Sequence, residues 1–358
     1  MPTTMSSTLS SHTTTTAAAL SSSSSLNLKR SPISKLAISF SPKTLTNAKP
    51  FTFKSSSNPL PALSPIASTS SSSATRSTIT SKPKSLKSRL QNGDTLYGIF
   101  LLTFSPTVAE IAGLAGFDFA ILDMEHGPGG ITEALHCLRA LAASQTPAIL
   151  RLPESSPTWA KKALDLGPQG LMFPMIESPK MAREAVSYCR FPPEGIRGSA
   201  HTVVRASDYG MDEGYLSNYG GELLVMCQVE SVEAVKNAEE IAAVDGVDCV
   251  QMGPLDLSAN MGYLRDPGNK KVKEMLMKGE EAVLRCGRAY LSGIAKPSDG
   301  AMDLKSRGYH MMSGASDVGL FRNAAVEDVM RFKVQCLEKE GGRNHSKEDD
   351  DDEKYWSE

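Results

Sequence analysis

Two acidic residues follow predicted strands. Glu230 comes directly after the apolar run Leu223–Val229, and Asp256 follows the apolar run Val247–Met252 and a Gly-Pro break. Between them, Ser231 is the expected N-cap of a helix, because apolar residues recur after it at helical spacing. Parallel strands of one strand–helix–strand unit end at the same edge of their sheet, where ligands bind. Glu230 and Asp256 are therefore expected to face each other across a pocket.

Two carboxylates with no thiol or imidazole beside them suit a hard divalent cation. Mg²⁺ is the favoured ion, with Mn²⁺ and Co²⁺ as alternatives, because such ions take about six oxygens and leave positions for water and substrate. Taken singly, Glu230 could instead cap a helix and Asp256 could form an Asx-turn. Residues at the ends of consecutive barrel strands carry the chemistry of barrels, so the pair favours a metal site.

Further polar residues follow other predicted strands. Asp123, Glu125 and His126 come after Phe119–Leu122, and Arg151 comes after Ala148–Leu150. Together with a metal they could process a 2-oxo acid, whose carboxylate and keto oxygens the metal would hold. Arg151 would stabilise the charge on the keto oxygen as an enolate forms. His126 would transfer a proton, with Asp123 or Glu125 orienting it and setting its pKa.

Two more positions complete the candidate site. Gln228 lies two residues before Glu230, on the same predicted strand. Backbone N–H groups at Leu255–Leu257, where a helix should begin, could hold the substrate carboxylate. The metal ligands would be Glu230 and Asp256.

These residues can meet at one edge of a sheet only if strands and helices alternate along the chain. The sequence shows this alternation from Asp94 onward. Eight predicted strands in about 250 residues indicate a single (β/α)₈ TIM barrel, here assigned to residues 94–340. An open doubly wound sheet is the alternative, but its Gly-x-Gly-x-x-Gly fingerprint is missing. The stretch Phe191–Gly221 interrupts the alternation and is too long for a connection without a role. The predicted strands are Thr95–Leu101, Phe119–Leu122, Ala148–Leu150, Gly170–Phe173, Leu223–Val229, Val247–Met252, Tyr290–Ala295 and Tyr309–Ser313, with a closing helix over Phe321–Leu337.

The two ends of the chain differ from this domain in composition. The first 93 residues contain 11 Lys and Arg, no Asp or Glu, and many Ser and Thr. This composition predicts a disordered chloroplast transit peptide over 1–77 and a linker over 78–93, with the stroma as the destination. An ordinary disordered leader is the alternative. Residues 341–358 are strongly acidic and predict a solvated tail.

Charge and cysteine usage exclude several classes of function. Beyond residue 93 the chain has 27 basic and 40 acidic residues, which disfavours a nucleic-acid partner. No apolar stretch is long enough for a membrane span. The six cysteines form no C-x-x-C pair, so free thiols and no zinc site are expected.

Several strings of this sequence, FDFAILDMEHGP, ILRLP, MFPMIES, FPPEGIRG, CQVES and GPLDLSANMGY, together resemble the HpcH/HpaI aldolase family of the phosphoenolpyruvate/pyruvate barrel superfamily. The resemblance runs from about Thr95 to Leu337. It implies metal-dependent cleavage of 4-hydroxy-2-oxo acids to pyruvate and an aldehyde. It also implies a homohexamer in which the last helix packs on a neighbour. The residues it assigns are Glu230 and Asp256 to the metal, Arg151 and Gln228 to pyruvate, and His126, paired with Asp123, to catalysis.

This sequence departs from the family pattern at three positions that the resemblance places on the aldehyde side of the pocket. Met124 stands where Gly is common, Phe100 where Trp is common, and Leu255 where Ala precedes the metal Asp. The aldehyde is therefore left open. Three alternatives also remain: a CoA-thioester lyase of the citrate or malyl-CoA lyase type, a Schiff-base aldolase using Lys296, and a plastid metabolite-binding barrel without turnover.

Overall fold

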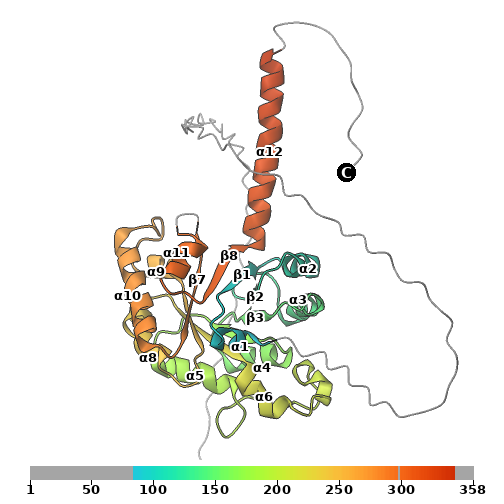
Figure 1. Ribbon diagram of the computed structural model, residues 1–358, viewed down its shortest axis with the longest axis vertical. Coiled ribbons are helices and arrows are strands. Elements are labelled where there is room, and N and C mark those ends of the chain that lie inside the picture. The colour runs from blue at the N-terminus through green and yellow to red at the C-terminus, as the bar shows by residue number, and fades with distance from the viewer. Residues whose placement is uncertain (1–83, 297–298, 343–358) are drawn as a thin grey trace, which may run out of the picture. The chain divides into compact units, whose positions relative to one another are not determined.

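Eight parallel strands close into a barrel in chain order, with β8 paired to β1 (Figure 1). The computed structural model describes residues 84–296 and 299–342. The predicted (β/α)₈ TIM barrel is confirmed, and the open-sheet alternative is wrong because the sheet has no free edge. The strands are β1 (Leu96–Leu101), β2 (Phe119–Asp123), β3 (Ala148–Arg151), β4 (Gly170–Phe173), β5 (Leu224–Val229), β6 (Cys249–Met252), β7 (Tyr290–Ile294) and β8 (Met311–Ser316).

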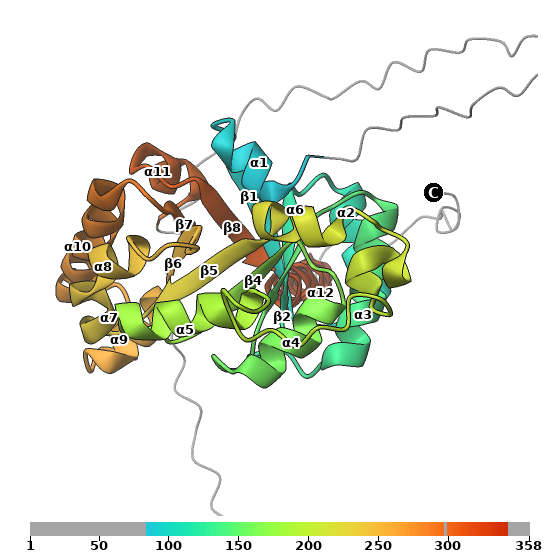
Figure 2. The same ribbon diagram turned by 90° about the horizontal axis from the view of Figure 1, so that it is seen from below.

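Most helices follow the strands and cover the outside of the barrel, whereas α1 precedes β1 and α12 projects away from the barrel (Figures 1 and 2). Several begin at a serine N-cap. Ser231, which was expected in this role, accepts a hydrogen bond from the N–H of Ala234. The helices are α1 (Leu86–Gln91), α2 (Pro106–Leu114), α3 (Ile131–Ala143), α4 (Pro157–Asp165), α5 (Pro179–Cys189), the 3₁₀ segment η1 (Arg205–Gly210), α6 (Tyr215–Glu222), α7 (Val232–Lys236), α8 (Ala238–Ala242), α9 (Pro254–Asn260), α10 (Lys270–Cys286), α11 (Ala301–Ser306) and α12 (Asp317–Gly342).

The alternation of side chains along the strands builds two apolar cores. The larger one lies between strands and helices and includes Leu122, Leu150 and Val250. The smaller one fills the barrel interior and includes Phe100, Phe119 and Met226. Because every strand is covered on both sides, the strands are continuous apolar runs, which is why they could be located in the sequence.

The predicted linker, 78–93, is partly wrong, because α1 belongs to the barrel. Leu86 and Leu90 are one helical turn apart, and both are buried against the interior core. Polar contacts fix the same helix: Lys87 forms an ion pair with Asp248 at 2.8 Å. The folded domain therefore begins before Asp94, and α1 lies across the amino ends of the strands (Figure 2).

Three further elements differ from the sequence-based expectations. The helix expected after Ser231 is divided into α7 and α8 at Asn237, whose side chain donates to the carbonyl of Glu177 at 2.7 Å. The irregular stretch Phe191–Gly221 contains η1 and most of α6. Helix α10 was not predicted, although Val272 and Val283 are buried on one face of it.

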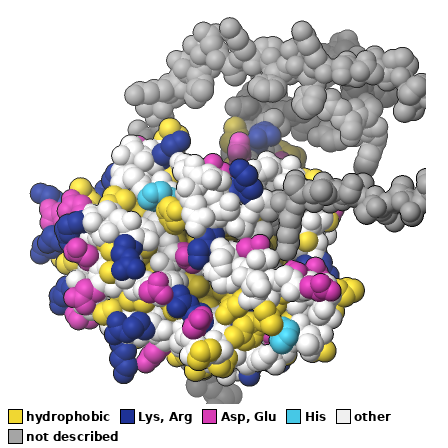
Figure 3. Space-filling view, turned by 60° about the horizontal axis from the view of Figure 1, so that its bottom comes forward, with side chains coloured by type: hydrophobic (Ala, Val, Ile, Leu, Met, Phe, Trp, Pro, Cys, Tyr) yellow, Lys and Arg dark blue, Asp and Glu magenta, His cyan; other side chains and the backbone are white. Residues whose placement is uncertain are grey.

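Several expectations for the ends of the chain lie outside the described residues, among them the transit peptide over 1–77 and the acidic tail. No helix of the described part is long and apolar enough to cross a bilayer. All six cysteines are free thiols, as expected. On the face drawn in Figure 3, basic and acidic side chains are interspersed, so this face offers no extended basic surface to a nucleic acid.

Shortening Leu90 to Ala should destabilise the barrel, because it leaves a cavity under the interior core. A buried Leu→Ala change costs about 2–5 kcal/mol in the free energy of unfolding. Denaturant unfolding of residues 78–340 with and without the change measures this loss, and Gln91→Ala, at an exposed position of the same helix, is the control. Equal stability of the Leu90→Ala and Gln91→Ala proteins would show that α1 is a dispensable attachment.

Candidate active site

A buried guanidinium, Arg151, lies at the end of β3 and joins two carboxylates of the segment after β2. Its Nε donates to Asp123 at 2.8 Å and a terminal nitrogen donates to the other oxygen of that carboxylate. The other terminal nitrogen lies 2.9 Å from Glu125. Phe100 of β1 faces the guanidinium, with 5.1 Å between its ring centroid and the central carbon. Hydrogen bonds to Asp123 use two of the five guanidinium N–H groups, and Glu125 Oε2 lies close as an ion-pair partner without a hydrogen bond.

The ionisation of this cluster follows from its burial and its pairing. Burial tends to lower the pKa of Arg151, but the hydrogen bonds and charges of Asp123 and the charge of Glu125 raise it overall. Burial raises the pKa of Glu125, against the opposing charges of Arg151 and His126. Arg151 therefore remains a cation, as a stabiliser of an enolate must.

His126 lies at the edge of this cluster, with its side chain 58% exposed. Its Nε2 is 3.9 Å from Glu125. The expected pairing of the His126 ring with Asp123 is not observed. Asp123 instead uses one oxygen to accept hydrogen bonds from the backbone N–H groups of Glu125 and His126, at 3.1 and 3.3 Å. Asp123 fixes the backbone of the loop, and Glu125 is the carboxylate beside the imidazole.

Across the barrel mouth, Glu230 follows β5 and is almost completely buried. One carboxylate oxygen accepts the N–H of Met175 at 2.7 Å, and the other accepts the side-chain amide of Gln228 at 2.8 Å. Burial raises the pKa of Glu230 to about 7, assisted by the charges of Glu125 and Asp256. A carboxylate held in this way would be stabilised in its ionised form by a cation.

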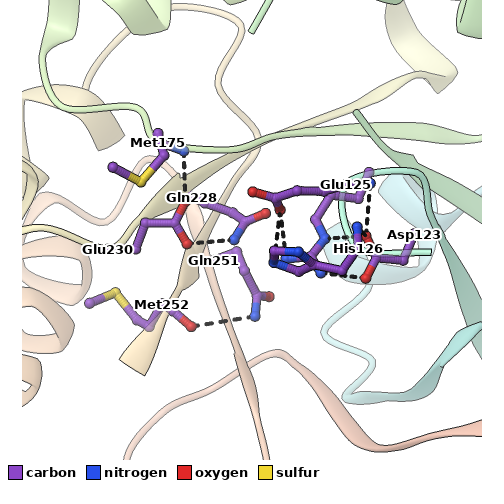
Figure 4. Close-up of polar contacts among 9 residues, drawn as sticks. Asp123, Glu125, His126, Met175, Gln228, Glu230, Gln251 and Met252 are labelled. Atoms are coloured by element: carbon purple, nitrogen blue, oxygen red, sulfur yellow. Dashed lines mark hydrogen bonds and ion pairs between the residues drawn. The ribbon is translucent and has the colours of Figure 1, made fainter. Parts of the chain in front are cut away.

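Gln228 lies between the two sides of the mouth (Figure 4). Its amide nitrogen is held by Glu230, while its Oε1 is buried without a partner among the described residues. In Figure 4 this oxygen points toward the Glu125 and His126 side. A buried amide oxygen without a partner is costly, so this atom indicates where a bound polar group would lie.

Two backbone features allow Glu230 to occupy its position. A Cβ added at Gly253, at the end of β6, would lie 2.4 Å from a carboxylate oxygen of Glu230, so only glycine fits. Met175 has a φ of +50°, which directs its N–H at the same carboxylate. Such a conformation costs a non-glycine residue about 1–3 kcal/mol and is typical of functional sites.

Asp256 and Leu255 lie in the first turn of α9, beside Glu230. Asp256 is exposed, and its charge acts on both Glu230 and Glu125, so it faces the same mouth. Leu255 is 56% exposed. The N–H groups of Leu255 and Asp256 lack an acceptor within the helix, as first-turn groups do. The expectation that the N–H of Leu257 could hold a substrate carboxylate is wrong, because this N–H donates to the carbonyl of Gly253.

The donor set fits a hard divalent cation held in an open site. Glu230 and Asp256 offer carboxylate oxygens, which Mg²⁺ prefers. Among residues 84–296 and 299–342, no three His, Cys, Asp or Glu side chains lie close enough to form a closed metal cage. Glu230 and Asp256 are the residues that would hold the ion, in a site open to water and substrate.

Several contributors to this site were not identified from the sequence. The sequence indicates Gly253 only as a strand break, and it assigns no role to Met175, because a backbone N–H carries no side-chain signal. Met124 was expected in the pocket, but it is buried in the core between strands and helices. Phe100 does lie inside the barrel, where it supports Arg151.

Comparisons with known proteins agree with this geometry. The chain is 36% identical over 243 residues to the hydroxypyruvate/pyruvate aldolase of Chromohalobacter salexigens, covering 68% of this chain and 95% of the relative. It is 33% identical over 247 residues to the 2-keto-3-deoxy-L-rhamnonate aldolase of Escherichia coli, and the match covers 69% of this chain and 92% of the relative. A crystal structure of an HpcH/HpaI aldolase/citrate lyase family protein from Burkholderia cenocepacia superposes with a TM-score of 0.66 at 35% identity, covering 69% of this chain and 98% of that one.

A sequence profile also matches most of the barrel. It spans residues 96–324, from the first residue of β1 into α12. The matched segment includes every candidate site residue described above. The chain therefore belongs to the HpcH/HpaI aldolase/citrate lyase family.

Proposed function

We propose that this carbon–carbon lyase reversibly cleaves a 4-hydroxy-2-oxo acid to pyruvate and an aldehyde, using a divalent metal ion at Glu230 and Asp256. The supporting observation is that the buried cation Arg151 and these two carboxylates share one barrel mouth. This arrangement can hold a 2-oxo acid between a metal ion and a guanidinium. Mg²⁺ is the proposed ion, because an open set of carboxylate oxygens suits it.

When bound, the cation would polarise the keto group of the substrate. Cleavage breaks the bond between C3 and C4, and its electron pair moves into the enolate of pyruvate. N–H groups of Arg151 that Asp123 does not use would donate to the developing oxyanion. Its contacts with Asp123 and Glu125 keep these donors oriented before the reaction, so little reorganisation is required.

His126 would accept the proton of the 4-hydroxyl as the aldehyde forms. Its exposed position at the rim suits contact with the part of the substrate that leaves. Glu125, 3.9 Å away, would stabilise the protonated ring. Gln228 would hold the bound 2-oxo acid through a bridging water that donates to its unpartnered oxygen and to the acid.

The comparisons favour an aldolase over the CoA-thioester lyase alternative. The relatives from Chromohalobacter salexigens and Escherichia coli, which are 36% and 33% identical to this chain, are both aldolases. The first is named for hydroxypyruvate and pyruvate, and the second for 2-keto-3-deoxy-L-rhamnonate. We propose the same 2-oxo acid chemistry for this chain.

We also propose a homo-oligomer, a hexamer by family resemblance, in which α12 packs on a neighbouring subunit. Apolar side chains on this helix are exposed in the single chain, among them Phe321 at 76% and Phe332 at 66%. They lie all around the helix, and a helix of that kind is normally buried. A neighbouring copy would cover them.

We further propose that the protein acts in the chloroplast stroma. The proposal rests on the Ser/Thr-rich, acid-free composition of the first 93 residues. A charge of about −13 beyond this leader is compatible with a soluble protein of that compartment.

Removal of metal should abolish cleavage, because Glu230 and Asp256 are the proposed charged ligands. Chelation should stop pyruvate release from 4-hydroxy-2-oxo acids, and Mg²⁺, Mn²⁺ or Co²⁺ should restore it. Glu230→Gln should lose both turnover and calorimetric metal binding, whereas exposed Glu240→Gln should retain both. Full activity in excess chelator would refute the metal-dependent reaction, and borohydride trapping at Lys296 would favour the Schiff-base alternative.

Exchange of pyruvate methyl protons separates the roles of Arg151 and His126. Arg151→Ala should slow exchange in deuterated water by about 10²–10³-fold, because one lost oxyanion stabiliser has that effect. His126→Ala should abolish cleavage while retaining part of the exchange. NMR measures exchange, and pyruvate release measures cleavage. Normal exchange without Arg151 would contradict its assigned role, and equal losses without His126 would place that residue in enolisation.

Charges on α12 should weaken the oligomer. Phe321→Glu together with Phe332→Glu should reduce the mass in analytical ultracentrifugation, since burying a carboxylate in an apolar contact is unfavourable. Gln335→Glu adds a charge to the same helix without removing an apolar group and should leave the mass unchanged. A wild-type protein that is already monomeric would disprove the proposed assembly.

A further inference from the structure

Lys296 lies at the barrel mouth, just past the end of β7. Along this strand Ser292 is buried and Ile294 packs on the interior core, while Ala295 packs on the outer core. The N–H of Ala295 still donates to the carbonyl of Ser313 on β8, so the extended backbone continues beyond the strand. Continued alternation past the strand end would direct Lys296 to the inside of the barrel, at its mouth.

The ammonium of Lys296 lacks a counter-ion within the described chain, where no side chain forms an ion pair or hydrogen bond with it. Asp299, in the same turn, is the nearest carboxylate to act on it. Both oxygens of Asp299 are occupied by the guanidinium of Arg307, at 2.7 and 2.9 Å. Arg307 is held in turn by Glu280 at 3.0 Å, so Asp299 is not free to turn to Lys296.

The electrostatic surroundings of Lys296 favour the binding of an anion. Burial lowers its pKa, the charge of Asp299 raises it, and the positive charge of Lys273 on α10 lowers it again. A half-buried cation beside a second cation is stabilised when an anion binds. Arg151, by contrast, already contacts two carboxylates.

The position of Lys296 relative to the 2-oxo acid site is equally informative. Arg151, Glu230 and Asp256 follow β3, β5 and β6, so the 2-oxo end of a substrate is held on that side. β7 adjoins β6, which places Lys296 on the next part of the rim. The acid after β8, Asp317, is satisfied by N–H groups of Leu102 and Thr103 at 2.9 and 3.0 Å. Among the described residues at β7 and β8, Lys296 is thus a cation that can meet the far end of a substrate.

We propose that Lys296 binds an anionic group, a carboxylate or a phosphate, carried by the aldehyde part of the substrate. The inference rests on the proposed aldolase function, whose 2-oxo acid end lies at Arg151. A substrate would then be held at both ends, and the C3–C4 bond would lie between the two cations. Lys296 is a specificity-determining residue in this role, not a nucleophile.

Matched aldehyde pairs test the proposal in the synthetic direction with pyruvate. Glyceraldehyde 3-phosphate is compared with glyceraldehyde, and succinic semialdehyde with propionaldehyde. For each pair the ratio of kcat/KM for the anionic aldehyde to that for the neutral one is measured. In Lys296→Met the ratio should fall by about 10- to 100-fold, the usual worth of a hydrogen bond to a charged group. A fall in one pair alone identifies phosphate or carboxylate as the recognised group.

Three controls keep the outcomes distinct. Lys296→Arg should retain most of the ratio, because it keeps a cation at the same place. Lys271→Met removes an exposed charge of α10 and should leave the ratio unchanged. The wild-type KM for the anionic aldehyde should rise with salt, and that for the neutral one should not. Should Lys296→Met not fold, Lys296→Gln replaces it in the same comparison.

An unchanged ratio in Lys296→Met, or an equal fall in Lys271→Met, would overturn the inference. Exchange of pyruvate methyl protons, which needs no aldehyde, separates this result from a failure of the proposed function. A wild-type protein with neither exchange nor cleavage would contradict the aldolase itself. Exchange and cleavage without charge selectivity would contradict only the role of Lys296.

Discussion

The ion pair between Arg151 and Asp123 is the interaction on which the candidate site depends. Both groups are buried, and an isolated charge there would cost several kcal/mol, so the pair is tolerated only because each compensates the other. Asp123 also accepts two backbone N–H groups of the next residues. One carboxylate therefore fixes both the guanidinium and the loop that carries His126. Losing it would leave a buried cation without its main partner and a loop without its anchor.

The barrel turns this local pairing into a two-sided site. Eight parallel strands deliver their carboxyl ends to one mouth, so residues far apart in sequence meet there. The segments after β2 and β3 supply positive charge and a proton-transfer group, and those after β5 and β6 supply carboxylates for a metal. Gln228 lies between the two sides with one unpartnered oxygen (Figure 4). The aldolase is thus assembled by the fold rather than by any single motif.

The sequence predicted the fold well because strands buried on both faces are continuous apolar runs. The predicted strand Gly170–Phe173 matches the structure residue for residue. Helix α1 was missed because two leucines in a short helix give no periodic signal, and their burial depends on the barrel opening below. Candidate site residues could be placed near one another, since strand ends share an edge. Which carboxylate pairs with which cation could not be predicted, because side-chain reach across the mouth decides that: Asp123 meets Arg151, and Glu125 is the one beside His126.

The contact between Gly253 and Glu230 sets a limit on how this lineage can change. Any side chain at position 253 would displace the carboxylate that the proposed metal requires. Leu255, two residues later and largely exposed, carries no such restriction. Substitution is therefore excluded at position 253 and tolerated two residues later, at position 255. New aldehyde specificities could arise along this rim by single substitutions, while the 2-oxo acid half of the site stays as it is.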